Sequence, residues 1–157
     1  MANPSKVRGT RFETAFQTWW SQNVGPCHRL TLHGRDDLGD VGGISVMGLE
    51  GVVECKNYKY RQKKKENRRP TEGQLMKWFD ETEKERVASC SDFALLAIHK
   101  PGCTDRVVNK HVADSFKDNW CWLTTRSYQL LSGGSTGASD DVSWVQLTVG
   151  EVADLCR

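Results

Sequence analysis

LGDVGGISVMGLEGVVECKN, residues 38–57, contains two apolar runs separated by a short turn. Asp40 opens the first run, and Glu54 and Lys56 close the second. Since side chains two residues apart in a strand share a face, Glu54 and Lys56 project to one side and Cys55 to the other. If the two runs pair as an antiparallel hairpin that turns at Met47 to Glu50, Asp40 lies beside Glu54. The stretch therefore predicts two carboxylates and a lysine on one patch at the edge of a sheet.

This combination of side chains suits the hydrolysis of a phosphodiester. Mg²⁺ is commonly held by one or two carboxylates with waters and phosphate, and it can activate water and neutralise phosphoryl oxygens. Asp40 and Glu54 are the candidate ligands, and the backbone carbonyl of Cys55 is a further one; Mn²⁺ is expected to substitute. Lys56 could orient or deprotonate the attacking water, or stabilise charge in the transition state, and the residues leave these roles open. Glu13 could extend the site through a metal-bound water.

Two other acids compete with Asp40 for the first ligand position. Asp36 and Asp37 lie in the turn GRDDLG just upstream. Asp40 is preferred because it opens the apolar segment, where rigid backbone would fix a ligand. The pair Gly42-Gly43 in that segment indicates a bulge or the close approach of another backbone.

Length and composition predict one domain over residues 1–157. The chain has 38% hydrophobic residues and a net charge of +2, with a mean hydropathy of −0.59, and no apolar run approaches the roughly 20 residues of a membrane span. The segment MANPSKVRGT lacks the hydrophobic core of a signal peptide. We therefore expect a cytoplasmic protein that is not secreted and has no membrane partner.

The six cysteines form no CxxC pair. Free thiols in a reducing compartment are the favoured interpretation. A zinc site built from Cys90, His99 and Cys103 is the less favoured alternative, because structural zinc ligands normally occur as close pairs.

The periodicity of the chain predicts an α/β fold with a central mixed sheet flanked by helices. In the core, about residues 6–100, we expect helices over 6–23 and 71–89 and strands over 29–33, in the hairpin and over 93–98. We expect the second helix to bury Leu75, Trp78, Phe79 and Thr82. Its solvent-facing side should carry Glu81, Glu83, Lys84 and Glu85.

The C-terminal extension, residues 101–157, is harder to interpret, and its role is left open. The segment 107–116 reads as a strand or short helix, 120–123 as a strand, 126–131 as a helix and 142–147 as a strand. Thr148 with Glu151 forms a capping-box pattern that predicts a final helix.

A basic segment directly follows the proposed acidic patch. Residues 56–69 hold eight basic side chains and one acid. Cations beside such a site would hold a polyanion against it, so we expect DNA as the partner. The candidate DNA-binding residues are Arg8, Arg11, Arg35, Lys59, Arg61, Lys63, Lys64, Lys65, Arg68 and Arg69.

On these residues the chain resembles the PD-(D/E)xK nuclease superfamily. Gly39-Asp40 corresponds to the first half of the motif, with glycine in place of proline, and Glu54-Cys55-Lys56 to the second. Glu13, on a helix before the sheet, is similar to the additional N-terminal acid of archaeal-type Holliday junction resolvases. GRDDLGDVGG and VVECKN, followed by Gln74 and Trp78, resemble small phage-encoded endonucleases of this kind.

The resemblance implies a restriction-endonuclease-like core, metal-dependent cleavage of branched DNA and a homodimer, in a bacterial host if the chain is phage-encoded. Asp40 and Glu54 would bind the metal, Lys56 would serve the water, Glu13 would assist, and Gln74 would lie near the site. Two alternatives stay open. One is a restriction-type or nicking enzyme that cuts ordinary duplex, and the other is a nucleic-acid-binding module that has lost turnover.

Overall fold

The computed structural model describes residues 3–30, 39–60, 64, 68–133 and 143–157. Its helices are α1 (Pro4–Asn23), α2 (Glu72–Ala88), the 3-10 helix η2 (Asp114–Asp118), α3 (Thr125–Leu131) and α4 (Val149–Cys156). Its strands are β1 (His28–Arg29), β2 (Val41–Val46), β3 (Leu49–Lys56), β4 (Phe93–Ile98), β5 (Val107–Val108), β6 (His111–Val112), β7 (Trp120–Thr124) and β8 (Trp144–Thr148).

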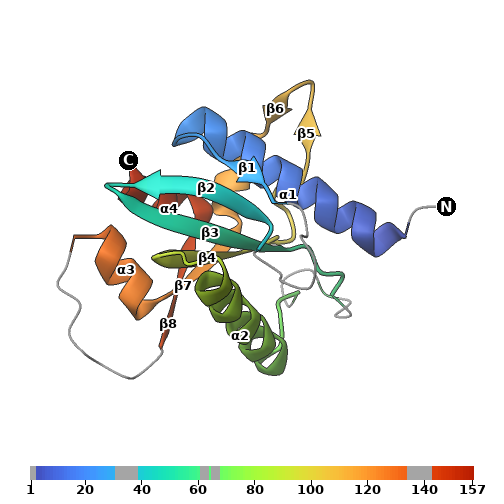
Figure 1. The fold of residues 1–157 in the computed structure, drawn as a ribbon. Helices are drawn as coiled ribbons and strands as arrows, with labels where there is room; N and C mark the ends of the chain where they lie inside the picture. The colour runs from blue at the N-terminus through green and yellow to red at the C-terminus, as the bar shows by residue number, and fades with distance from the viewer. Residues whose placement is uncertain (1–2, 31–38, 61–63, 65–67, 134–142) are drawn as a thin grey trace.

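A mixed sheet with the order β1-β2-β3-β4-β7-β8 forms the centre of the fold, as predicted (Figure 1). β3 and β4 run parallel, while the other neighbouring strands of this sheet run antiparallel. The parallel pair requires a crossover, and α2 supplies it. β7 and β8 come from residues 101–157, so the C-terminal extension completes the sheet.

The β2–β3 hairpin forms where the sequence predicts it. Its turn is Met47-Gly48, with φ angles of 50° and 81°. Positive φ at both central residues is the conformation whose twist matches that of paired strands. The turn is tighter than the predicted 47–50, because β3 already begins at Leu49. The register shifts between Val41 and Ile44, where Gly43 has a φ of 74°, so the predicted bulge is present.

The two faces of the sheet are covered by different helices (Figure 1). α1 and α4 pack on one face with Leu95 and Ala97 of β4. α2 packs on the other face with Leu96 and Ile98. Successive side chains of β4 thus alternate between two apolar layers, one on each face of the sheet. This explains why FALLAI is a continuous apolar run.

Several sequence expectations need correction. The described part of the first strand is His28–Arg29, and residues 31–38 lie outside the described ranges, with Asp36 and Asp37 among them. Residues 107–116 form the small β5–β6 hairpin and the start of η2. Glu85, expected on the wet face of α2, is buried.

The remaining helix predictions hold. Thr71 caps the N-terminus of α2. Thr148 and Glu151 form the predicted capping box on α4. Among the described residues, no helix is both long and apolar enough to cross a membrane.

Gly51 tests how closely β3 and β4 pack. A Cβ at this position would lie 2.2 Å from ring carbons of the buried Phe93, whereas a Cβ at Gly9 in α1 would meet nothing within 4 Å. We expect Gly51→Ala to lower the free energy of unfolding by about 1–3 kcal/mol through overpacking. Gly9→Ala should raise it by up to about 1 kcal/mol through helix propensity. Urea denaturation measures both, and equal midpoints would contradict the close fit at Gly51.

Candidate functional site

Asp40 lies directly against the end of β3. The backbone N–H of Asp40 donates to the carbonyl of Val53 at 2.9 Å. Its Oδ2 accepts a hydrogen bond from the backbone N–H of Cys55 at 2.7 Å. These two contacts hold Asp40 beside the segment Glu54-Cys55-Lys56.

Glu54 and Lys56 project to the same face of β3, as their spacing predicts. Oε1 of Glu54 lies 2.9 Å from Nζ of Lys56. Cys55 points the other way, into the apolar layer beneath α1. The structure thus brings Asp40, Glu54 and Lys56 together at the carboxyl end of β3.

Helix α2 adds two acids that the sequence analysis did not assign to the site. Oε2 of Glu81 lies 2.9 Å from Nζ of Lys56. Glu85, one turn further on, is 5% exposed, and its carboxyl neighbours that of Glu54. The signal was available in part, because residues 78, 81 and 85 share one stripe of a helix and Trp78 was expected to be buried.

Burial and the crowding of acids raise the pKa values of Asp40 and Glu54. Burial, followed by repulsion from Glu54 and Glu13, raises the pKa of Asp40 to about 9. Burial and the adjacent Glu85 carboxyl raise the pKa of Glu54 to about 8. Burial opposes the charge on Lys56, but the carboxylates of Glu54 and Glu81 outweigh it, so the pKa of Lys56 is raised. The lysine is therefore protonated at neutral pH.

The acid pair fits a hard divalent cation. Within the described ranges, no three histidine, cysteine or acidic side chains are grouped so that they could hold a metal ion. Mg²⁺ requires less from a protein, namely one or two carboxylates. Oε2 of Glu54 is buried beside the carboxyl of Glu85, which can donate a hydrogen bond to it only while it carries a proton. A cation held by Asp40 and Glu54 would satisfy this oxygen and reverse the repulsion that raises both pKa values.

The other predicted site residues differ in their placement. Glu13 of α1 is close enough to raise the pKa of Asp40, and its Oε2 pairs with Arg29 at 2.6 Å. Gln74 lies on the same stripe of α2 as Glu81, two turns away, which corresponds to about 10 Å along the axis. Its backbone N–H donates to Thr71, and no side-chain hydrogen bond to the acids is present among the described residues.

A hollow of about 450 Å³ opens where the chain leaves β3, directly after Lys56. We call it the basic hollow. Its lining includes four cationic side chains, those of Arg8, Arg11, Lys59 and Arg68.

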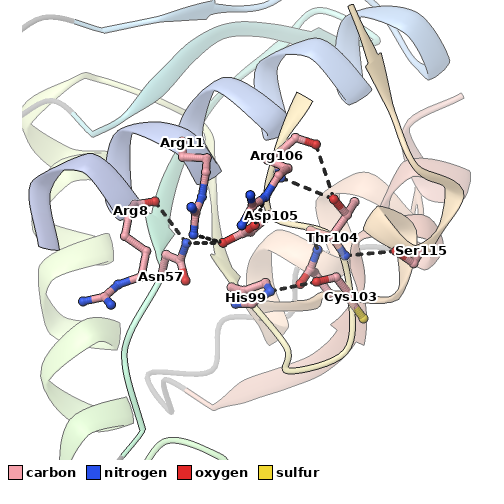
Figure 2. A network of polar contacts seen from close by, with 10 residues as sticks. Arg8, Arg11, Asn57, His99, Cys103, Thr104, Asp105, Arg106 and Ser115 are labelled. Atoms are coloured by element: carbon pink, nitrogen blue, oxygen red, sulfur yellow. Dashed lines mark hydrogen bonds and ion pairs between the residues drawn. The ribbon is translucent and has the colours of Figure 1, made fainter. Parts of the chain in front are cut away.

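Asp105 anchors one wall of the basic hollow (Figure 2). Arg11 donates to Asp105 at 2.6 Å and the Asn57 amide donates to it at 3.1 Å. Burial opposes ionisation of Asp105, but these hydrogen bonds outweigh it and lower its pKa. The Arg8 guanidinium points away from Asp105 in Figure 2, and its buried Nε has no partner in the described part of the chain. A terminal nitrogen of Arg8 donates to the Ser5 hydroxyl at 3.3 Å, and Nε of Arg11 is likewise buried without a partner. The two arginines differ in charge compensation, because Asp105 pairs with Arg11 whereas no acid pairs with Arg8 within the described ranges.

Only some of the remaining predicted DNA-binding residues lie within the described ranges. Lys64 is exposed. Arg35, Arg61, Lys63 and Lys65 lie outside the described residues.

The alternative zinc site is not formed. Cys90 precedes β4 and His99 follows it, so the length of the strand separates them. His99 Nε2 instead lies 2.9 Å from the carbonyl oxygen of Cys103. All six cysteines are unpaired thiols.

Replacing Glu85 tests the crowding of acids. In the metal-free protein, the folded chain keeps the Glu54 proton that the unfolded chain loses, so stability should fall as the pH rises from about 4.5 to about 8. Glu85→Gln removes a neighbouring charge and offers an amide donor, so we expect this fall to shrink. Thermal unfolding in EDTA across this range measures it.

The matched control is Glu83→Gln, because Glu83 pairs with Arg86 on the same helix and away from the cluster. This variant should follow the wild-type pH profile. A Glu85→Gln profile parallel to that of the wild type would show that Glu85 has no influence on Glu54.

Comparison of the chain with protein-family models, with curated proteins and with solved structures gives no match.

Proposed function

We propose that this protein is a Mg²⁺-dependent endonuclease that hydrolyses phosphodiester bonds in DNA, with a four-way junction or other branched DNA as its substrate. The proposal includes a restriction-endonuclease-like arrangement of the core. The observation that carries it is the meeting of Asp40, Glu54 and Lys56 on one patch, with Asp40 bonded to the Cys55 N–H and Lys56 to Glu54.

The protein's own groups divide the work. Asp40 and Glu54 would hold the ion, with Glu13 nearby to assist. When bound, Mg²⁺ neutralises phosphoryl oxygens and lowers the pKa of a coordinated water. Because Lys56 is held protonated by two carboxylates, its N–H groups can stabilise charge or orient the water. A protonated lysine can orient the water or stabilise charge in the transition state, but it cannot deprotonate the water. These two roles of Lys56 are therefore favoured over that of a general base.

The basic hollow supplies the contact with the DNA backbone in this proposal. It begins at Asn57, the residue after Lys56, and Arg8, Lys59 and Arg68 contribute its cations. Phosphate contacts of this kind position a nucleic acid without reading its sequence. The predicted homodimer stays a prediction, and light scattering of the purified protein tests it.

A cleavage assay tests the function and separates the alternatives. Labelled four-way junction, plain duplex and single strand of matching sequence are incubated with protein in Mg²⁺ or in EDTA. Symmetric cuts confined to the junction and abolished by EDTA are the expected result. Equal cutting of plain duplex would indicate the restriction-type alternative, and binding without cutting in any condition would indicate a module without turnover.

Lys56 is the most direct target for mutation. We expect Lys56→Ala to lower the cleavage rate by roughly 10²–10³-fold, as the loss of a preorganised donor to the transition state does. Binding of the junction in EDTA should change little, because the cations of the basic hollow remain.

Lys84→Ala is the matched control, since Lys84 forms an exposed pair with Asp80 on the same helix as Glu81. It should cleave like the wild type. Near-normal turnover by Lys56→Ala would remove Lys56 from the mechanism.

A further inference from the structure

A second hollow lies at the N-terminal end of α2, on the side of the helix away from the acid cluster. It has a volume of about 740 Å³, and Trp120 and Trp122 of β7 form its floor together with Leu75. Three cations, Arg68, Arg69 and Lys100, line it beside a single acid, Glu72. We call it the tryptophan hollow.

The register of the sheet relates these tryptophans to the acid cluster. Lys56 pairs with Ile98, which pairs with Trp120, and Glu54 pairs with Leu96, which pairs with Trp122. The two tryptophans therefore occupy the same two rows as Glu54 and Lys56 and project to the same face. Since neighbouring strands lie about 4.8 Å apart, each tryptophan backbone is about 10 Å from its counterpart on β3.

Trp120 and Trp122 are only partly buried. Leu96 and Ile98, directly under α2, are fully buried, whereas Trp120 and Trp122 remain partly exposed. Phe79 of α2 contacts Trp122, with ring centroids 5.3 Å apart, but it stacks in parallel on Trp144 rather than on Trp122. Indole surface thus remains open to the tryptophan hollow.

We propose that the tryptophan hollow binds an unpaired stretch of single-stranded DNA, with bases stacked on Trp120 and Trp122 and phosphates against the cations. Aromatic side chains inside a basic groove are the usual means of holding single strands, because every base has a face that can stack. The inference rests on the proposed function for the identity of the polymer as DNA.

Charge and continuity favour a polyanion over an apolar peptide or a second copy of this chain. Three cations and one acid line the hollow, and this excess of positive side chains attracts a polyanion and repels a basic segment. Arg68 lines both the basic hollow and the tryptophan hollow, so one strand can pass from one to the other. The strand would then continue from the acid cluster around the start of α2.

The test is binding of a labelled oligothymidylate of about ten nucleotides, followed by fluorescence anisotropy in EDTA so that no cleavage occurs. We expect Trp120→Ala to weaken binding by roughly tenfold and Trp120→Phe to restore most of it, because phenylalanine still stacks. Lys100→Gln, at an exposed side chain, should reduce the salt dependence of binding by about one counterion.

Trp144→Ala is the matched control, because Trp144 lies on the same face but outside the tryptophan hollow. It should bind the oligonucleotide like the wild type. Circular dichroism and thermal unfolding show whether each variant is folded, and the Lys100→Gln result stands even where a tryptophan variant is not.

Unchanged binding by folded Trp120→Ala together with an unchanged salt slope for Lys100→Gln would overturn the proposal. A Trp120→Ala variant that no longer forms a dimer in light scattering but still binds the oligonucleotide would also overturn it. That result would indicate that the tryptophans contact a second copy of this chain. Binding of a proline-rich peptide in place of the oligonucleotide would assign them to a peptide. Junction cleavage with no effect of the tryptophan variants would refute this inference alone, and tryptophan-dependent binding without any cleavage would refute the nuclease alone.

Discussion

The crowding of three carboxyl groups in one corner, with those of Glu54 and Glu85 buried and that of Asp40 partly buried, is the constraint on which the rest of the candidate site depends. Asp40, which directly precedes β2, Glu54 of β3 and Glu85 of α2 are brought together, and Lys56 pairs with Glu54. Like charges in a poorly solvated place disfavour ionisation, so the pKa values of Asp40 and Glu54 are raised well above their ordinary range. A fold built only for stability would gain from replacing one of them, and a cation that binds the ionised forms supplies a reason for keeping them.

The backbone around Asp40 is shaped to allow this crowding. Gly39 has a φ of 95°, and a Cβ there would lie 2.5 Å from a methyl group of Val52. The glycine found where the resembled family has proline is therefore required by close packing and by a left-handed conformation. The crossover helix between β3 and β4 then closes the corner, because α2 returns over the same face to which Glu54 and Lys56 project.

Period-two reasoning predicted the hairpin, the shared face of Glu54 and Lys56 and the proximity of Asp40, since each depends on a local repeat. The burial of Glu85 could not be predicted in this way. A charged residue on an amphipathic helix is ordinarily assigned to solvent, and only the placement of α2 over β3 reverses that assignment. The tryptophan hollow was missed for a similar reason, because the order of β4, β7 and β8 in the sheet is a tertiary fact. The extension from residue 101 onward showed no motif of the nuclease superfamily that the chain resembles, yet two of its strands complete the sheet.

The geometry of the two hollows bears on which DNA could be a substrate. In a duplex, the bases are stacked on one another and only their edges reach the grooves, so a double helix lying over the acid cluster leaves Trp120 and Trp122 without a stacking partner. A strand that leaves the helix exposes base faces within a few nucleotides of the break in pairing. Under the proposed function, the basic hollow would contact phosphates in either case, whereas the tryptophan hollow would contribute only where pairing ends. If the two act on one strand, preference for branched over plain duplex DNA follows from stacking energy rather than from any reading of sequence.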